Sequence, residues 1–193
     1  MTVDLSEIAR YMRMGTSLPE GELAARIEKL RDEALGIVRT ARTWRRFKVS
    51  DGAIKSGSVQ LEIGGSLARH IAGCHDAFLV CGTIGPAFDA FQRRASVSSG
   101  VDALVVQAIG AALIEKWMDE TEDEIRKELA PGESLVSRYS PGYGDFPLSA
   151  QRTLLALLDA PLRAGVSLTD SLLMVPSKSV SAVIGVKKGM SSE

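Results

Sequence analysis

The feature that most constrains the fold is a single long helical pattern from Ser99 to Leu129. Pro131-Gly132 close it, because proline cannot continue a helix and glycine favours the residue after a helix end. Around this helix, shorter helical and strand patterns mix without the regular alternation of βαβ units. The predicted class is therefore α+β, with an antiparallel or mixed sheet flanked by helices.

The remaining elements are shorter. Helical spacing predicts helices over 4–13, 18–41, 66–73, 86–94 and 151–158, and alternation or apolar runs predict strands over 44–49, 58–63, 77–83, 135–138, 172–174 and 180–186. The last two strands are expected to pair as a hairpin across Pro176. We expect residues 1–42 to form a helical N-terminal extension and residues 43–193 to form the main domain.

Composition excludes several classes. A net charge of −1 over 193 residues argues against a nucleic-acid binder, and the one dense basic group is Arg42, Arg45, Arg46 and Lys48. No apolar run approaches the roughly 20 residues that cross a membrane. The N-terminus lacks a signal-peptide core, and two cysteines, Cys74 and Cys81, suggest reduced thiols, so the expected location is the cytoplasm.

A candidate ligand loop begins at Arg138, which precedes Ser140-Pro-Gly-Tyr-Gly144. A guanidinium can hold a carboxylate with two hydrogen bonds. Pro141 fixes its own φ, and Gly142 and Gly144 allow positive φ and a close approach of the backbone to a ligand. With the aromatic face of Tyr143, the loop suits a small ligand that carries a carboxylate and a flat ring. An ordinary tight turn beside a surface arginine is the alternative.

Glu115 is the second candidate, because it interrupts a small and apolar stripe of the long helix. That stripe consists of Leu104, Ala108, Ala111, Glu115 and Met118 at 3–4 spacing. A buried carboxylate requires a partner. Glu115 is therefore either a boundary residue bonded to a lysine or to backbone amides, or a ligand carboxylate at the mouth of a pocket.

Three separated blocks resemble the activation domain of vitamin B12-dependent methionine synthase. Leu168-Thr-Asp-Ser171, Met174-Val-Pro176 and Ser179-Val-Ser181 match, in order, the family's LTES, Met-x-Pro and SVS segments. Arg138 and Tyr143 have the spacing of the family's RPAPGYP, and Leu113 to Asp119 align with its LAEAFAE helix. The resemblance covers about residues 100–185.

The resemblance implies an S-adenosylmethionine site made of Glu115, Arg138, Pro141, Gly142, Tyr143 and Gly144. Arg138 would hold the methionine carboxylate, Glu115 would pair with an amino or ribose group, and Tyr143 would orient the nucleoside. It implies no catalytic residue, because methyl transfer from a sulfonium to cobalt depends on position. Two departures stand out. Gly144-Asp145-Phe146 replaces the family's Pro-Ala-Cys, and the segment that supplies an aspartate in full-length enzymes has no match.

The chain contains no Asp-x-His-x-x-Gly cobalamin motif, so we expect cobalamin only through a partner protein. The implied role is a reactivation subunit for a cobalamin-dependent methionine synthase, with an electron donor for the partner and no turnover alone. The alternative is a non-catalytic S-adenosylmethionine sensor that docks on a corrinoid protein. An enzyme unrelated to cobalamin is a third possibility.

Other polar residues indicate little chemistry. His70, Cys74 and His75 lack further ligands at metal spacing, so no metal is expected. Gly82 to Gly85 is too short for a dinucleotide fingerprint, although its backbone could approach a ligand closely. Ser179 and Ser181 are expected to satisfy hydrogen bonds at a sheet edge.

Overall fold

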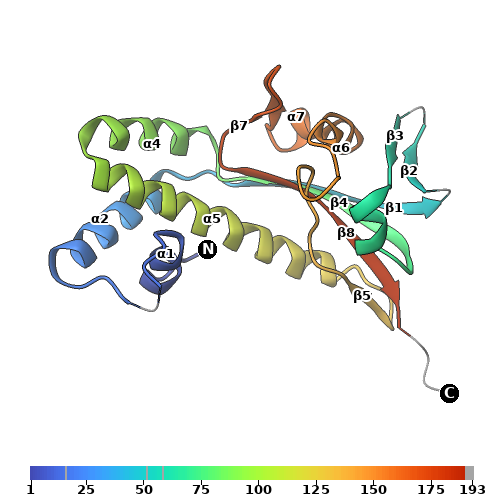
Figure 1. Cartoon of the computed structure of the whole chain (residues 1–193), viewed down its shortest axis with the longest axis horizontal. Coiled ribbons are helices and arrows are strands. Elements are labelled where there is room, and N and C mark those ends of the chain that lie inside the picture. Colours follow the sequence, from blue (N-terminus) through green and yellow to red (C-terminus); the bar gives the residue numbers. More distant parts are fainter. Residues whose placement is uncertain (16, 51, 58, 190–193) are drawn as a thin grey trace.

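The computed structural model describes residues 1–15, 17–50, 52–57 and 59–189, and it has helices on both sides of a curled antiparallel sheet (Figure 1). The α+β prediction is confirmed. The helices are α1 (Leu5–Tyr11), α2 (Gly21–Ile37), α3 (Gly65–His70), α4 (Pro86–Ser98), α5 (Gly100–Arg126), α6 (Ala150–Leu158) and α7 (Ala160–Arg163). The strands are β1 (Ala41–Ser50), β2 (Ala53–Ser56), β3 (Val59–Glu62), β4 (Cys74–Thr83), β5 (Glu133–Leu135), β6 (Ser167–Leu168), β7 (Met174–Val175) and β8 (Ser179–Lys188).

The main sheet has the strand order β3-β2-β1-β4-β8-β5, and every neighbouring pair is antiparallel. β4 lies between β1 and β8, with Val80 opposite Trp44 on one side and Ala182 on the other. Since β4 is covered on both faces, its sequence is a nearly continuous apolar run and does not alternate between polar and apolar residues.

Alternate residues of β4 supply two hydrophobic layers, because successive side chains of a strand point to opposite faces. Phe78 and Val80 pack with the buried side of α5, while Ala77, Leu79 and Cys81 pack with α6 and α7. The sheet is therefore the middle layer of the molecule. α5 lies along one face and the α6–α7 segment along the other (Figure 1).

The N-terminal helices share the α5 layer. Ile8 of α1 and Ile27 of α2 are fully buried in the same hydrophobic cluster as Ile109 of α5. Arg26 of α2 also forms an ion pair with the buried carboxylate of Asp102. These two helices lengthen the apolar core beside α5. The expected boundary between a helical extension, residues 1–42, and a main domain, residues 43–193, stays a prediction.

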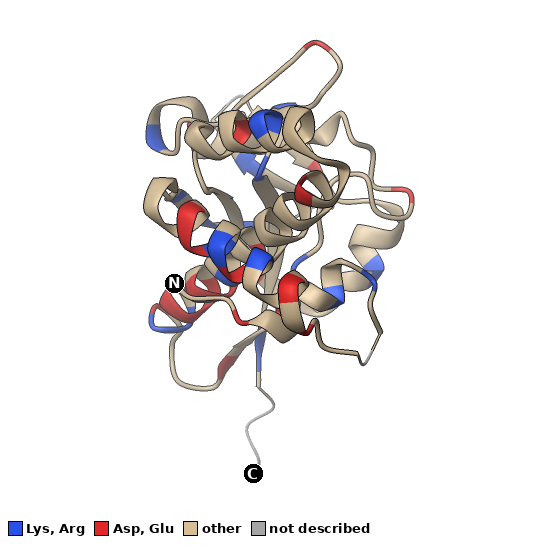
Figure 2. Cartoon of the chain, turned by 90° about the vertical axis from the view of Figure 1, so that its left-hand side faces the viewer, with Lys and Arg blue, Asp and Glu red and all other residues tan. Residues whose placement is uncertain are grey.

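α5 begins where its sequence predicts. The Ser99 hydroxyl caps it by accepting hydrogen bonds from the backbone N–H groups of Val101 and Asp102 at 3.2 and 3.3 Å. Among the described helices, α5 included, none combines the length and the apolar character needed to cross a bilayer. On the side of the molecule that faces the viewer in Figure 2, acidic and basic positions alternate along the ribbon and neither charge forms one large block.

Two local predictions are wrong. β7 pairs with β6 and not with β8, so the expected hairpin across Pro176 does not form. The long partner of β8 is β4, about 100 residues earlier in the chain, and a pairing at that distance leaves no local signal. Helix α2 also ends at Ile37, earlier than expected, because β1 already begins at Ala41 and pairs with Thr83.

Candidate ligand site

A pocket of about 710 Å³ lies where α5, the loop before α6 and the start of β8 meet. Its lining comes from Glu115, Asp119 and Glu122 of α5, from Ser137, Arg138, Ser140, Pro141, Gly142 and Tyr143 of the loop, from Gln151 of α6, and from Met174, Ser179, Val180 and Ser181. Five of the six predicted ligand residues line this pocket, and the sixth, Gly144, does not.

The loop is a compact turn closed by its own backbone. The N–H of Gly142 donates to the carbonyl of Phe146 at 2.8 Å, and the N–H of Tyr143 donates to the carbonyl of Ser140 at 3.3 Å. Gly142 has a φ of +96°, as its position in the turn predicts, and residues with a Cβ rarely adopt this value. The ring of Tyr143 stays 64% exposed at the pocket rim.

The residues that depart from the family pattern fasten this loop to α3. The carboxylate of Asp145 accepts hydrogen bonds from the backbone N–H and the hydroxyl of Ser66, at 2.6 and 2.5 Å. These bonds, led by the hydroxyl, lower the pKa of Asp145. Phe146 is buried in the α6 layer. Gly144 has a φ of +55°, and a Cβ there would lie 2.6 Å from the Ser66 hydroxyl oxygen, so Gly144 permits close packing against α3.

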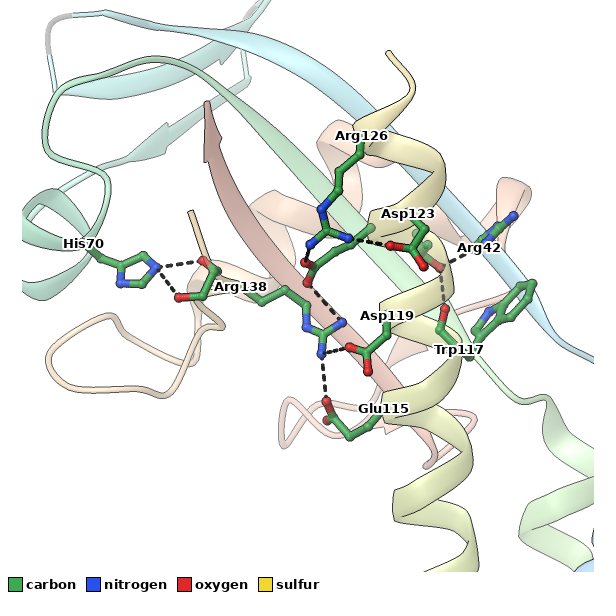
Figure 3. Close-up of polar contacts among 11 residues, drawn as sticks. Arg42, His70, Glu115, Trp117, Asp119, Asp123, Arg126 and Arg138 are labelled. Atoms are coloured by element: carbon green, nitrogen blue, oxygen red, sulfur yellow. Dashed lines mark hydrogen bonds and ion pairs between the residues drawn. The ribbon is translucent and has the colours of Figure 1, made fainter. Parts of the chain in front are cut away.

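A second fastening holds the residue before Arg138. The Nε2 of His70 donates to the carbonyl of Ser137 at 2.7 Å (Figure 3). The ring of His70 also lies 4.7 Å from the ring of Tyr139. The backbone of Tyr139 in turn exchanges two hydrogen bonds with Val183 of β8, both 2.9 Å. The loop therefore begins from backbone that is held on both sides.

Arg138 points across the pocket to a row of acidic side chains on α5 (Figure 3). Its Nη2 lies 2.9 Å from both Glu115 Oε2 and Asp119 Oδ1, and its Nη1 lies 3.2 Å from Glu122 Oε1. The three acids follow one another at i, i+4 and i+7, so they share one face of the helix. The immediate surroundings of Arg138 therefore carry more negative than positive charge.

Glu122 is the most buried of these acids, with 12% of its side chain exposed. Burial raises its pKa, while Arg138 and Arg126 oppose that shift. Arg126 pairs with Glu122 and with Asp123, at 3.0 and 2.6 Å, outside the pocket (Figure 3). Glu115, in contrast, has 44% of its side chain exposed and lies at the mouth of the pocket, bonded to Arg138.

Three buried polar atoms of the pocket lining have no hydrogen-bond partner among the described residues. They are Gln151 Oε1, Ser181 Oγ and Arg138 Nη1, although Arg138 Nη1 still forms its ion pair with Glu122 at 3.2 Å without hydrogen-bond geometry. Buried polar groups are nearly always satisfied, so unpartnered ones beside a cavity mark positions that a ligand or water can fill. Ser179, in contrast, donates its hydroxyl proton to the carbonyl of Pro176 at 2.6 Å.

Sequence reasoning missed Asp119, Glu122 and Gln151. Asp119 and Glu122 follow Glu115 at i+4 and i+7, so all three acids share one face of the helix. This spacing points to the site only when Arg138 is known to lie opposite that face. The expected stripe was also partly wrong, because Leu104 is 51% exposed. Gln151 gave no signal beyond being a polar residue at the start of a leucine-rich helix.

The other candidate residues lie in separate environments. His75 contacts the carboxylate of Glu133 at 3.0 Å, His70 contacts the backbone carbonyl of Ser137, and Cys74 is a free, partly buried thiol. Among the described residues no group of three or more His, Cys, Asp or Glu side chains could hold a metal ion. Gly82 packs against the side chain of Met118, and Gly85 packs against the backbone of Arg39.

The basic group on β1 is used in internal contacts. Arg42 stacks over Trp117, Arg45 donates to the carbonyl of Leu157, and both Arg46 and Lys48 pair with Asp76. Arg45 points to the α6 side while its neighbours point to the other side. These four side chains therefore do not form one continuous basic face.

Comparison with known proteins identifies the family. The family model described as "Vitamin B12 dependent methionine synthase, activation domain" matches residues 87–191, which is more than half of the chain. Among solved structures, the chain is similar to one titled "Crystal Structure of the MetH Reactivation Domain bound to AdoHcy", with a TM-score of 0.66 and 17% identity over 98% of this chain and 75% of that one. No curated protein sequence matches the chain. The chain belongs to the vitamin B12-dependent methionine synthase activation domain family.

Proposed function

We propose that the chain is an S-adenosylmethionine-binding reactivation subunit for a cobalamin-dependent methionine synthase. In this role it supports reductive methylation of cob(II)alamin carried by a partner protein. The observation that carries the proposal is the pocket of about 710 Å³ between Arg138 and the acids of α5, in a chain of this family. The solved relative in the comparison is bound to S-adenosylhomocysteine, which differs from S-adenosylmethionine by one methyl group.

The charges of the pocket fit this ligand. S-adenosylmethionine carries a carboxylate, an ammonium group and a sulfonium centre, so its net charge is positive. Glu115, Asp119 and Glu122 outnumber the single guanidinium of Arg138, which favours a cation. When the ligand binds, its carboxylate would replace one of the acids on Arg138, and its ammonium group would pair with the acid that is released.

The methyl transfer requires the chain only to hold the ligand in the correct position. With one electron from the donor, the partner's cobalamin would be reduced and would attack the methyl carbon, so that a cobalt–carbon bond forms as the sulfur–carbon bond breaks and S-adenosylhomocysteine leaves. No proton moves in this displacement, so no general base is needed. Arg138, Glu115 and the Pro141–Tyr143 turn would hold the ligand with its methyl group toward the mouth, where the partner docks.

The same residues also suit the alternative function, a sensor that binds S-adenosylmethionine and docks on a corrinoid protein without methyl transfer. In either role the partner is a cobalamin-binding subunit, and an electron donor acts on that partner only in the first. The free thiols Cys74 and Cys81 support a reducing compartment, the cytoplasm.

Isothermal titration of the full chain with S-adenosylmethionine tests the binding step. We expect one site per chain, with S-adenosylhomocysteine competing for it. The cationic ligand should bind more tightly than the neutral one, and salt should reduce that preference because the acids are partly exposed. A folded chain that binds neither ligand would overturn the proposal.

A further inference from the structure

One extra residue interrupts the pairing with β8 where the ligand loop begins. The backbone N–H of Val136 donates to the carbonyl of Gly185 at 2.9 Å, which continues the register of β5 with β8. Tyr139, three residues after Val136, exchanges both of its backbone hydrogen bonds with Val183, which is only two residues from Gly185. The segment therefore contains a β-bulge, in which the two residues between Val136 and Tyr139 lie opposite a single residue of β8.

The bulge determines the direction in which Arg138 points. Val136 and Tyr139 both pack against the hydrophobic cluster of the α6 layer, although they are three residues apart. In a regular strand, residues two apart share a face, so Arg138 would lie with Val136 on the α6 side of the sheet. With the extra residue, Arg138 lies on the other side and reaches Glu115 and Asp119 of α5, both at 2.9 Å.

His70, the last residue of α3, holds this bulge from outside the sheet. Its Nε2 donates to the backbone carbonyl of Ser137 at 2.7 Å and lies 3.4 Å from the Ser137 hydroxyl oxygen (Figure 3). Its ring lies 4.7 Å from the ring of Tyr139. One imidazole therefore contacts both neighbours of Arg138 in the chain. The residue inserted by a bulge is unpaired in the ladder, so a donor from elsewhere can fix its conformation.

We propose that His70 is a positioning residue for Arg138. By binding the Ser137 carbonyl, it holds the bulge in the geometry that turns the guanidinium of Arg138 toward α5 and the ligand site. His70 lies outside the pocket lining, so it acts through the backbone and not on the ligand. The effect on ligand binding rests on the proposed function, whereas the effect on the orientation of Arg138 does not.

Calorimetry with S-adenosylmethionine measures the effect on the ligand site. His70→Ala removes the donor to the Ser137 carbonyl, so binding should weaken about three- to tenfold, which corresponds to one hydrogen bond. His70→Gln should recover most of the affinity, because the side-chain amide of glutamine supplies an N–H donor of similar reach. His75→Ala is the matched control, since His75 contacts Glu133 and not the bulge, and it should leave the affinity unchanged.

A double-mutant cycle with Arg138→Ala separates positioning from general damage to the fold. If His70 acts through Arg138, then His70→Ala should have little further effect in a chain that already lacks the Arg138 side chain. A purely structural role would instead weaken binding by the same factor in both backgrounds.

NMR of the nitrogen-labelled chain tests the orientation of Arg138 without any ligand. The Nε–H signal of Arg138 is assigned by its loss in Arg138→Lys. We expect this signal to be shifted from that of a free arginine in the wild type and in His70→Gln, because the guanidinium is fixed against the acids of α5. In His70→Ala it should move toward the free value.

Each outcome decides the proposal. Unchanged affinity in folded His70→Ala, losses that add in the cycle, or an unchanged Arg138 signal would each contradict it. If the wild-type chain binds no S-adenosylmethionine, the proposed function falls, and the Arg138 signal alone decides the role of His70. Should His70→Ala fail to fold, His70→Gln is compared with His70→Asn, whose amide is too short to reach the carbonyl, and equal affinities of these two variants would contradict the proposal.

Discussion

At the residue scale, Arg138 connects the ligand loop to α5. Its guanidinium contacts three acids of one helix while its backbone lies between the held residues Ser137 and Tyr139. A planar fork of donors can bond several oxygens at once, which a lysine ammonium cannot reproduce in the same geometry. Arg138 is therefore both a ligand candidate and the counter-charge of the acidic row.

Replacing Arg138 with alanine should weaken S-adenosylmethionine binding by about 1.5–3 kcal/mol, the range for a hydrogen bond to a charged group. Arg138→Lys should recover part of that loss, because it restores the charge and not the fork. Arg126→Ala is the matched control, since Arg126 contacts the same acidic row outside the pocket. Calorimetry that finds unchanged affinity in folded Arg138→Ala would remove this residue from the site.

The sequence could identify Arg138, Glu115 and Tyr143 from local patterns. Arg138 and Tyr143 belong to the Pro-Gly loop, and Glu115 interrupts an apolar stripe of the long helix. The sequence could not show that Arg138 is already paired with acids, since those contacts join segments about 20 residues apart around Pro131-Gly132. Nor could it place Gly144 against Ser66, a contact that depends on the packing of α3.

At the element scale, α5 is both the main core helix and one wall of the pocket. Gly110 lies in its middle, where the ring of Phe88 from α4 and the stem of Lys178 approach the helix closely. A Cβ on Gly110 would lie 2.5 Å from a ring carbon of Phe88. Since Phe88 is fully buried, its ring has little room to move.

Gly110→Ala should therefore destabilise the protein by about 1–3 kcal/mol through overpacking. This result runs against helix propensity, which alone favours alanine by roughly 1 kcal/mol. Gly36→Ala in α2 is the matched comparison, because a Cβ there meets nothing within 4 Å, and it should stabilise by up to about 1 kcal/mol. Urea denaturation measures both. A Gly110→Ala chain as stable as the wild type would contradict the close packing.

Elements with strong local patterns were predictable. The helix expected over 99–129 is observed as Gly100–Arg126. The 77–83 strand is observed as Cys74–Thr83. β2 and β6 were not predicted, and the strand expected over 172–174 overlaps β7 only at Met174, because each of these strands has only two to four residues. Short strands lack enough alternation to reveal a period.

At the scale of the whole molecule, one ion network joins three strands of the sheet. Arg46 of β1 bonds Asp76 of β4 at 2.7 Å and Glu133 of β5 at 2.5 Å, although β5 does not neighbour β1 or β4. Glu133 also accepts a hydrogen bond from the backbone of Ala130. These bonds, led by that from Arg46, lower the pKa of Glu133 to about 2.

This shift predicts acid sensitivity with a definite sign. The usual pKa of Glu133 is 4.5, so between 4.5 and about 2 the unfolded chain binds more protons than the folded one. The stability that Glu133 contributes is therefore present above pH 4.5 and is lost as the pH falls toward 2. Glu133→Gln should be less stable than the wild type at neutral pH, and the difference should shrink across this window. A difference in urea midpoint that does not vary with pH would contradict the assignment.

In the proposed function, the pocket would present a methyl group to a cobalt carried by another protein. The most direct measurement mixes the chain with a cobalamin-binding methionine synthase subunit in the cob(II)alamin state, a reductant and S-adenosylmethionine, and follows the cobalamin absorption spectrum. We expect methylcobalamin only when chain, partner, reductant and ligand are all present, with slower formation for Arg138→Ala. Equally fast formation without the chain would contradict the proposed function, and binding of S-adenosylmethionine without any methyl transfer would favour the sensor.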